Sequence, residues 1–558
     1  MPIRMLLAAL LVVLAAAADA APIAGTASLS GAVQAPRAVP GAQVHLLNVD
    51  KNVLFMVWSS GGRYRAVNLF PGRYEVTVRT AGWTVDKQTI ALEPGEAKTL
   101  DLALREEAGR PVRQGEFGFT SGASTDARLV SYDELYPREP GRELLETQCM
   151  YCHGRNFFPS KQYPEVTWNT FIDVMLGQGA AADRGAMIPA GTLSAQDRQT
   201  ILAYLTRHFG PSSERRGLRM DAEFPVDEAA LGKAMYVEYY LPLDKQLDAA
   251  NKQRRTQQAH FDAAGNVWYT DRSVPNRIGR VNPRTGEVKD WMMPDPKADP
   301  HGLAVDRDGH VWWAETVGFH LGRLDPTTGS MLRYPMDSTG QRQGRGHSPI
   351  VDGKQNVWFT VIGGDMLGKW DRQTGKSTVW KVPTAGAAPY GIALDKDDNV
   401  WFAEFRRCKI ARFDPRTEKF TEYAAPTQPC TIRRLGVDST GSVWYGGFNN
   451  GKLGRLDPRT GAIKEYDVPM PFSEPYDVWP DRHDDIWISD GGQGGALIRF
   501  APRTETFTYY PTPQITDQPK LAITREGAVW YTPRSSLKAA VGVLYPDVTR
   551  VTTLAAYE

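Results

Sequence analysis

The 558-residue chain has few cysteines, no excess of one charge and no long hydrophobic run after its first 20 residues. Four cysteines in a chain of this length exclude a small fold built on many disulfides. Lys and Arg number 65 and Asp and Glu number 64, so the net charge of +1 excludes a uniformly basic nucleic-acid-binding protein. Apolar residues nevertheless make up 42% of the chain, so we expect sizeable hydrophobic cores.

The first 20 residues, MPIRMLLAALLVVLAAAADA, indicate an export signal. Arg4 gives a positive start, an apolar stretch follows, and Ala18-Asp19-Ala20 is a cleavage motif. The alternative is an uncleaved membrane anchor, but an apolar stretch of roughly 14 residues is short for a span. We therefore expect cleavage after Ala20 (signal peptide 1–20) and a periplasmic protein with no membrane span, in a compartment where disulfides persist.

Residues 25–105 alternate apolar and polar side chains over short runs such as 42–46 and 74–78, which is typical of half-buried strands. The segments Ser30-Gly31-Ala32-Val33 and Phe70-Pro71-Gly72-Arg73-Tyr74 resemble those of carboxypeptidase regulatory-like modules. The resemblance implies a small β-sandwich with a spacer or docking role. We expect the polar, Gly-rich residues 106–130 to form a linker.

Residues 131–212 have helical periodicity and contain Cys149-Met150-Tyr151-Cys152-His153. This C-x-x-C-H sequence is the attachment motif of c-type haem. Thiols one helical turn apart bond the haem, and the adjacent imidazole reaches its iron. A zinc site would need more ligands than His208, and a thioredoxin-like redox pair would need a βαβ context.

The segment resembles the small, single-haem class I cytochromes c. The resemblance implies an all-α domain with one covalent haem c on Cys149 and Cys152 and with His153 as an axial ligand. That family places an axial Met in a loop before its last helix, where this chain has Met187; Met175 is the alternative. A thioether opposite a histidine raises the reduction potential and favours electron transfer.

From residue 225 to 550 the sequence repeats with a period of 43–46 residues. Each repeat has a Trp preceded by Val or Ile, at Trp268, Trp312, Trp358, Trp401, Trp444, Trp487 and Trp530. Seven repeats of this period, each with four short strands, predict a seven-bladed β-propeller in which these indoles pack between blades. The fold class we predict is therefore multidomain and mainly β: a small β-sandwich, an all-α cytochrome c domain and a seven-bladed propeller.

Alignment of the repeats gives two sets of positions that we expect at one end of the central channel. The first set, near the inner strand, is Gln257, His301, His347, Tyr390, Arg433, Tyr476 and Lys520. The second set, three residues after each repeated Trp, is Asp271, Glu315, Val361, Glu404, Gly447, Asp490 and Pro533. So many polar groups predict a ligand or metal site at the opening, and hydrogen bonding within the channel is the alternative.

The repeats resemble streptogramin B (virginiamycin B) lyase, whose pattern is acid-Pro-His with a second acid fourteen residues after the His. Asp299-Pro300-His301 with Glu315 matches this pattern. The resemblance implies that His301 is a catalytic base and that Asp299 and Glu315 bind Mg²⁺. Gln257 stands where the family has a substrate-binding His, and Glu474-Pro475-Tyr476 with Asp490 is a second copy in which Tyr replaces the base.

Cys408 and Cys430 lie in loops that the alignment places at the channel opening, and we predict a disulfide between them. Free thiols and a metal site are the alternatives. Four arginines gather in the same region and are expected to attract an anionic substrate, a haem propionate or an acidic redox partner: Arg406, Arg407, Arg433 and Arg434.

The haem motif has the strongest residue-level support, so we predict an exported electron-transfer protein. Its partner would be a redox protein or a small-molecule or polymer substrate on the propeller opening. The alternatives are a Mg²⁺-dependent lyase that opens a cyclic ester or depsipeptide and a non-catalytic binding or scaffold protein.

Overall fold

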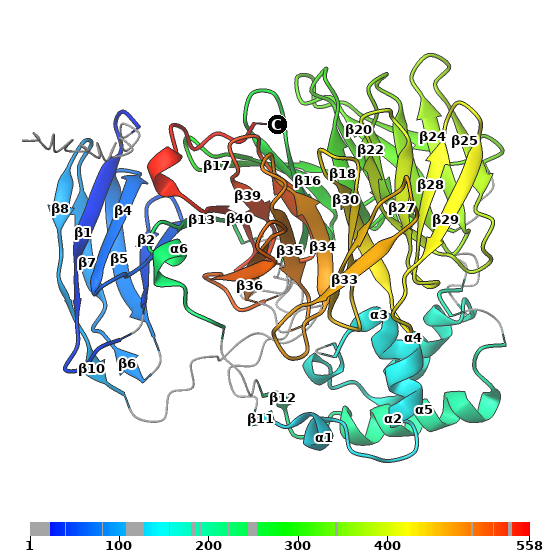
Figure 1. The fold of residues 1–558 in the computed structure, drawn as a ribbon, viewed down its shortest axis with the longest axis horizontal. Coiled ribbons are helices and arrows are strands. Elements are labelled where there is room, and N and C mark those ends of the chain that lie inside the picture. Colours follow the sequence, from blue (N-terminus) through cyan, green and yellow to red (C-terminus); the bar gives the residue numbers. More distant parts are fainter. Residues whose placement is uncertain are drawn as a thin grey trace, which may run out of the picture.

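The structure is a computed structural model with a mainly β fold, in which a sandwich lies beside a propeller and a small helical region lies below the propeller (Figure 1). It describes residues 23–39, 41–80, 82–107, 128–155, 157–179, 186–188, 191–219, 224–243, 254–340, 344–492, 495–516, 518–533 and 538–557. The expected export signal and most of the expected linker lie outside these residues. No helix within the described residues is long and apolar enough to cross a membrane.

The N-terminal strands form the sandwich. They are β1 (Ala27–Gln34), β2 (Gln43–Asn48), β3 (Val53–Trp58), β4 (Arg63–Leu69), β5 (Gly72–Arg79), β6 (Trp83–Thr84), β7 (Gln88–Leu92), β8 (Ala97–Thr99), β9 (Leu102–Ala103) and β10 (Arg105–Glu106). One sheet has the order β4-β1-β8 with β9 beside β1, and the other includes β3-β2-β5-β7. Leu29, Leu46 and Phe55 are fully buried between them, as the period-two pattern predicts.

The helical region contains α1 (Tyr132–Leu135), α2 (Arg142–Leu144), the π-helical turn η1 (Leu145–Met150), α3 (Tyr151–His153), the 3₁₀ turn η2 (Phe158–Ser160), α4 (Glu165–Met175) and α5 (Ala195–His208). Ser194 caps α5 through a capping box with Asp197, and α5 packs against α4. The ends of the region are joined by a parallel pair of strands, β11 (Arg128–Val130) and β12 (Arg216–Leu218). The structure therefore does not support an all-α domain, because the helices are short and strands close the region.

Seven sheets follow the seven repeats. Six are separate blades, each made of four consecutive strands. The first three blades are β14 (Thr256–Phe261), β15 (Val267–Asp271), β16 (Arg277–Asn282) and β17 (Glu287–Met292); β18 (Pro300–Val305), β19 (Val311–Glu315), β20 (His320–Leu324) and β21 (Met331–Pro335); and β22 (Arg345–Val351), β23 (Val357–Ile362), β24 (Met366–Asp371) and β25 (Lys376–Lys381). The next three are β26 (Pro389–Leu394), β27 (Val400–Glu404), β28 (Lys409–Asp414) and β29 (Lys419–Ala424); β30 (Ile432–Val437), β31 (Val443–Gly447), β32 (Lys452–Leu456) and β33 (Ile463–Asp467); and β34 (Pro475–Pro480), β35 (Ile486–Asp490), β36 (Ala496–Ala501) and β37 (Thr506–Pro511). The seventh consists of β38 (Leu521–Ile523), β39 (Val529–Tyr531), β40 (Ala540–Tyr545) and, from the N-terminal end of the repeat region, β13 (Met235–Tyr240). The short helix α6 (Glu228–Leu231) precedes β13, and the 3₁₀ turn η4 (Val548–Arg550) follows β40.

The seventh blade and the sandwich share one sheet. Strand β13 pairs antiparallel with β40 on one side and with β3 on the other, so that the order is β38-β39-β40-β13-β3-β2-β5-β7. All six residues of β13 are buried. The sandwich is therefore an extension of the last blade.

Each repeated Trp is buried and, in six blades, tied to an Asp six residues earlier. The indole N–H groups donate to the carboxylates at 2.8–3.1 Å, the acceptors being Asp262, Asp306, Asp352, Asp395, Asp438 and Asp481. In the seventh blade Thr524 occupies the Asp position, and Trp530 Nε1 has no partner among the described residues. The repeated Trp residues thus have a structural role within the blades, as predicted.

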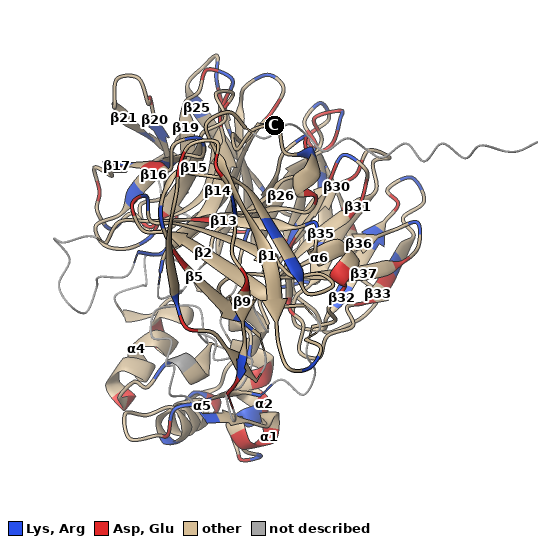
Figure 2. Cartoon of the chain, turned by 90° about the vertical axis from the view of Figure 1, so that its left-hand side faces the viewer, with Lys and Arg blue, Asp and Glu red and all other residues tan. Residues whose placement is uncertain are grey.

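Acidic and basic side chains are interspersed over the strands and the helical region in Figure 2. Neither positive nor negative side chains cover the face shown, consistent with the nearly equal numbers of acidic and basic residues.

Candidate functional site

The C-x-x-C-H motif lies against the loops at one end of the propeller (Figure 1). The Tyr151 hydroxyl donates to the Cys430 carbonyl, and Thr431 Oγ1 donates to the Tyr151 carbonyl at 3.3 Å. The Arg433 guanidinium donates to the Cys152 carbonyl. The motif is thus held by the chain segment that leads into the inner strand β30.

Neither Cys149 nor Cys152 forms a disulfide. Burial raises the pKa of the Cys149 thiol to about 12, and the neighbouring Cys152 adds to the shift. Burial also raises the pKa of Cys152, although Arg406 and Arg433 oppose that shift. Both side chains are therefore neutral thiols at neutral pH in this arrangement.

Met187 lies beside the motif. It packs with Cys152 against a buried aromatic cluster that includes Tyr390, Phe448 and Tyr476. The Arg406 guanidinium donates to the Met187 carbonyl and lies 3.9 Å from Cys152 Sγ. The two predicted ligand-bearing segments therefore reach the same part of the propeller.

The His153 ring faces an apolar wall. It stacks on Phe157 with ring centroids 4.1 Å apart and meets the edge of Phe158 at 6.3 Å. Phe158 belongs to the core of the helical region.

The first predicted set of channel residues does come together. The His301 and His347 ring centroids are 3.9 Å apart with planes tilted by 37°, and those of His347 and Tyr390 are 3.7 Å apart with planes tilted by 43°. The Tyr390 and Tyr476 hydroxyls are 2.8 Å apart, and Lys520 Nζ lies 3.2 Å from His301 Nδ1.

Arg433 completes this set and links it to the motif. Its Nη1 donates to the Tyr390 hydroxyl at 2.9 Å, and its guanidinium lies 3.8 Å from the Phe448 ring centroid and 4.4 Å from that of Tyr476. A chain of contacts therefore runs from Cys152 through Arg433 into the channel. Gln257, the seventh member, accepts a hydrogen bond from Arg272 at 3.3 Å.

The imidazole of His347 is neutral. Burial lowers its pKa well below the usual range, and Lys520 and Arg434 lower it further. One of these two cations is itself paired, because Arg434 lies 3.0 Å from Asp477.

The second predicted set does not join the first. Glu315 is paired with Arg333 at 2.6 Å and Glu404 lies beside Glu422; both partners come from the outermost strands of their blades. Asp490 accepts from Ser473 Oγ at 2.8 Å. The remaining members are Asp271, which is paired with Arg254 at 2.7 Å, and the three residues without a polar side chain, Val361, Gly447 and Pro533.

A bulge explains the separation. Pro300 pairs with Glu315 and Leu303 with Trp313, so one extra residue stands on the inner strand. The extra residue breaks the alternation from which we predicted that the two sets share a face. Similar register shifts occur at the start of the inner strands β14, β22, β26 and β30.

The predicted Mg²⁺ ligands are both engaged by arginines. Asp299 accepts from Arg272 Nε and Nη2, each at 2.7 Å, and Glu315 accepts from Arg333. Burial tends to raise the pKa of Asp299, but Arg272 outweighs it and the pKa is lowered. Guanidinium groups compete with a divalent cation for these oxygens, so the two carboxylates do not fit Mg²⁺ in this arrangement.

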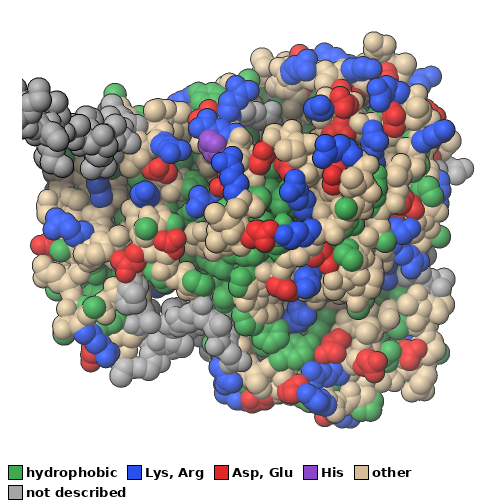
Figure 3. Space-filling view, viewed as in Figure 1, with side chains coloured by type: hydrophobic (Ala, Val, Ile, Leu, Met, Phe, Trp, Pro, Cys, Tyr) green, Lys and Arg blue, Asp and Glu red, His purple; other side chains and the backbone are tan. Residues whose placement is uncertain are grey.

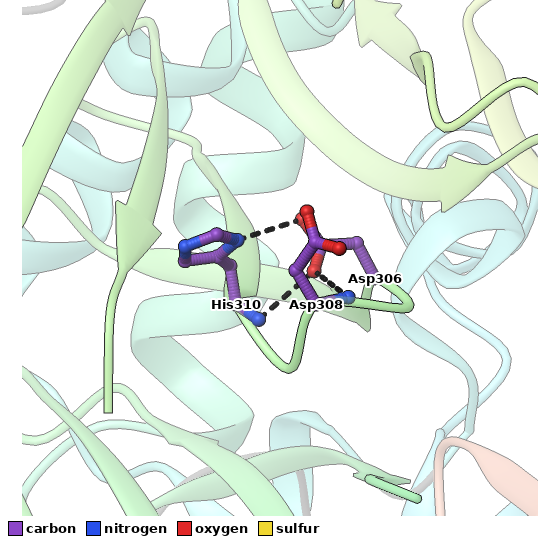
Figure 4. A group of neighbouring side chains, drawn as sticks. All are labelled: Asp306, Asp308 and His310. Carbon is purple, nitrogen blue, oxygen red and sulfur yellow. Dashed lines mark hydrogen bonds and ion pairs between the residues drawn. The ribbon is translucent and has the colours of Figure 1, made fainter. Parts of the chain in front are cut away.

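Asp306, Asp308 and His310 also lie within metal-binding distance of one another (Figure 4). Asp306 already accepts from the backbone N–H groups of Asp308 and His310 and from Trp312 Nε1. His310 stands where other blades have Asn bonded to the same Asp, as in Asn356 with Asp352 at 2.9 Å. This cluster is the structural turn of the repeat.

Cys408 and Cys430 form a disulfide, with their Cα atoms 5.3 Å apart. It joins the turn before β28 to the segment before β30, whose Cys430 carbonyl accepts from Tyr151. The bridge therefore fixes two of the loops on which the C-x-x-C-H motif lies.

Glu474 contributes a contact that we did not predict. Its Oε1 accepts from the Arg155 backbone N–H at 3.1 Å and from Arg155 Nη1 at 3.0 Å. Burial raises the pKa of Glu474 to about 7, although Arg155 opposes the shift. The sequence draws attention to Glu474 only through the second copy of the acid-Pro pattern at 474–476. Nothing in the sequence indicates that this acid contacts a residue 319 positions earlier.

Comparisons with known proteins identify two regions. Residues 245–500 match the virginiamycin B lyase family, and residues 28–105 match the carboxypeptidase regulatory-like domain. Neither match includes residues 131–212, and no curated protein matches the chain.

Similar solved structures are propellers. A streptogramin B lyase structure is 23% identical with a TM-score of 0.50 and covers 57% of this chain and 99% of its own. Virginiamycin B lyase from Staphylococcus aureus is 21% identical with a TM-score of 0.49 and covers 55% and 99%. At 23% identity the first likeness shows the fold alone. The two family models support a lyase-like propeller and a carboxypeptidase regulatory-like sandwich.

Proposed function

We propose that the protein is a periplasmic c-type cytochrome with one haem c on Cys149 and Cys152, and that it transfers single electrons at the propeller opening. One observation carries the proposal: the C-x-x-C-H motif lies on the loops around the channel, with both thiols outside any disulfide. The periplasmic location rests on the export signal in the sequence.

The residues around the motif fit a haem. Two thiols and the His153 imidazole follow the attachment order, and Met187 supplies a thioether beside Cys152. The surroundings are aromatic, and Arg406 offers a cation for a carboxylate substituent. When bound, the haem supplies a one-electron redox centre, whose potential a thioether ligand raises.

Two arginines of the propeller position the ligand segments. Arg433 binds the carbonyl next to His153, and Arg406 binds the carbonyl of Met187. Because Arg433 is buried among aromatic rings, it keeps its orientation and excludes water. The propeller therefore acts as one wall of the site.

The lyase function suggested by the similar structures has less support in this chain. Asp299 and Glu315 are occupied by arginines, and His301 Nδ1 faces Lys520. The helical region also lies on the loops at the channel opening, where a large cyclic substrate would have to enter.

The test is a redox titration of the full chain, produced in a host that attaches c-type haem. We expect a reversible one-electron transition in the visible spectrum. Met187→Ala changes the spectrum of the oxidised protein, whereas the matched variant Met175→Ala leaves it unchanged. A chain that carries no haem under these conditions overturns the proposal.

A further inference from the structure

Blade four differs from the other blades at the acid that stands three residues after its repeated Trp. In three other blades the acid at this position is paired with a side-chain donor: Asp271 with Arg254, Glu315 with Arg333, and Asp490 with Ser473. Glu404, by contrast, is 0% exposed, and neither of its carboxyl oxygens receives a hydrogen bond within the described part of the chain. The outer strand of blade four supplies a second acid, Glu422, where that of blade two supplies Arg333.

Three charged groups face Glu404: Glu422 of β29, Lys409 of β28 and Asp365 of the turn between β23 and β24. Lys409 Nζ lies 3.1 Å from Glu422 Oε2, and Lys381 Nζ lies 3.8 Å from Asp365 Oδ2. Two lysines therefore balance two of the three acids, and an ionised Glu404 would be a buried charge without a cation, which is costly. Burial and Glu422 accordingly raise the pKa of Glu404 to about 8, so that at neutral pH Glu404 donates its proton to Glu422.

Glu404 is also the first residue of a tight turn, residues 404–409, that carries Arg406. The Arg407 N–H donates to the Glu404 carbonyl at 3.0 Å, and Glu404 pairs with Lys409 where the turn ends. From the middle of the turn, the Arg406 guanidinium donates to the Met187 carbonyl. The acid pair at the base of the turn therefore supports the side chain that holds the Met187 segment.

Apolar side chains also hold the helical region against the propeller. Figure 3 shows hydrophobic side chains where the propeller meets the helical region. Apolar contact has no preferred direction, whereas a hydrogen bond does. The donation from Arg406 is thus the kind of contact that fixes where residues 186–188 lie on the propeller.

We propose that Glu404 and Glu422 form a pH-sensitive latch. While the two acids share a proton, the 404–409 turn holds Arg406 on the Met187 carbonyl, and loss of the proton releases this contact. Two neighbouring carboxylates repel each other, and the buried one reaches water only if the turn moves. The latch does not depend on haem. That it also regulates the thioether ligand of the haem rests on the proposed function.

The contact weakens as the pH rises. In the open turn Glu404 titrates near pH 4.5, whereas in the closed turn it keeps its proton up to about pH 8. The stabilisation of the closed turn is therefore complete below pH 4.5 and is lost as the pH rises to 8.

The experiment is amide hydrogen exchange of the full chain at pH 6 and pH 9, with labelling times scaled to the intrinsic exchange rate. The variant is Glu404→Gln, whose amide donates to Glu422 at either pH. We expect the ratio of wild-type to variant exchange rates in 404–408 and 186–188 to rise at least tenfold from pH 6 to pH 9. Each pH unit between the two pKa values changes the opening equilibrium tenfold. Glu418→Gln, at an exposed acid of the same blade, exchanges like the wild type.

An equal ratio at the two pH values overturns the inference. A pH effect confined to 404–408 also overturns it, because the turn would then open without releasing Met187. If Glu404→Gln does not fold, Glu422→Gln takes its place with the same expectation, since its amide donates to Glu404. A wild-type chain that shows the pH effect but takes up no haem leaves the latch standing and removes the proposed function.

Discussion

Arg433 is the residue that connects the helical region to the channel. It is 1% exposed, and its guanidinium contacts aromatic faces, the Tyr390 hydroxyl and the Cys152 carbonyl, with the charge of Glu474 nearby. If the proposed haem is bound, a buried positive charge beside it favours the reduced state, which is the less positive one. The residue thus has an electrostatic role as well as a positioning one.

We predict that Arg433→Gln lowers the reduction potential of the haem protein. The substitution removes the buried cation and retains a hydrogen-bond donor. Spectroelectrochemical titration measures the shift, and Arg416→Gln, at an exposed arginine of the propeller, is the control. Equal potentials in all three proteins would contradict the electrostatic role.

Glu404 makes the stability depend on pH. Burial and the neighbouring Glu422 raise its pKa from 4.5 to about 8, so the folded chain holds a proton that the unfolded chain releases above pH 4.5. The stability this group contributes is complete below pH 4.5 and is lost as the pH rises toward 8.

We therefore predict that the thermal midpoint of the wild type falls between pH 5 and pH 8 and that Glu404→Gln makes this fall smaller. A residual slope remains, because burial raises the pKa of Glu238 and Glu474 to about 7. Differential scanning calorimetry at both pH values measures the effect. Identical slopes in the two proteins would show that Glu404 does not hold the proton.

At the scale of elements, the Asp–Trp turn is the repeated connection within the blades, and the seventh blade lacks it. We predict that Thr524→Asp supplies the acceptor for Trp530 Nε1 and stabilises the protein by about 1 kcal/mol, the net value of one hydrogen bond. Asp438→Ala, which removes the acceptor of Trp444, should destabilise it by about 1–3 kcal/mol. Urea unfolding compares the two, and a destabilised Thr524→Asp protein would contradict the assignment.

The repeat pattern predicts the blades because apolar and polar side chains alternate along each strand. It does not predict that β13 joins β3, since pairing between two strand edges depends on where the backbone edges meet and no side chain marks it. The first channel set was predictable from alignment. The second was not, because a one-residue bulge turns Glu315 and Glu404 toward the outer strands of their blades.

At the scale of the whole molecule, Gly154 allows the helical region to approach the propeller. Its φ is +76°, and a Cβ there would lie 2.3 Å from Glu474 Oε2 and 3.2 Å from Phe448 Cζ. We predict that Gly154→Ala loosens this contact, with faster amide hydrogen exchange in residues 149–155. Gly179→Ala is the control, because Gly179 has a φ of +58° with no atom within 4 Å of its Cβ position. Equal exchange in the two variants would mean that backbone strain alone matters.

The sequence identifies the C-x-x-C-H motif but not its place on the propeller. The contacts between the two regions join residues about 220 to 320 positions apart, such as Met187 with Arg406 and Arg155 with Glu474. No local sequence pattern marks these side chains as contact partners, so only the folded chain shows that they meet.

Mass spectrometry of the peptide that contains residues 149–153 shows whether the protein carries a covalently attached haem. The chain is isolated from a host that exports it and attaches c-type haem. We predict that the peptide carries the mass of one haem and that Cys149→Ser/Cys152→Ser removes it. A peptide of unmodified mass from the wild-type chain would contradict the account.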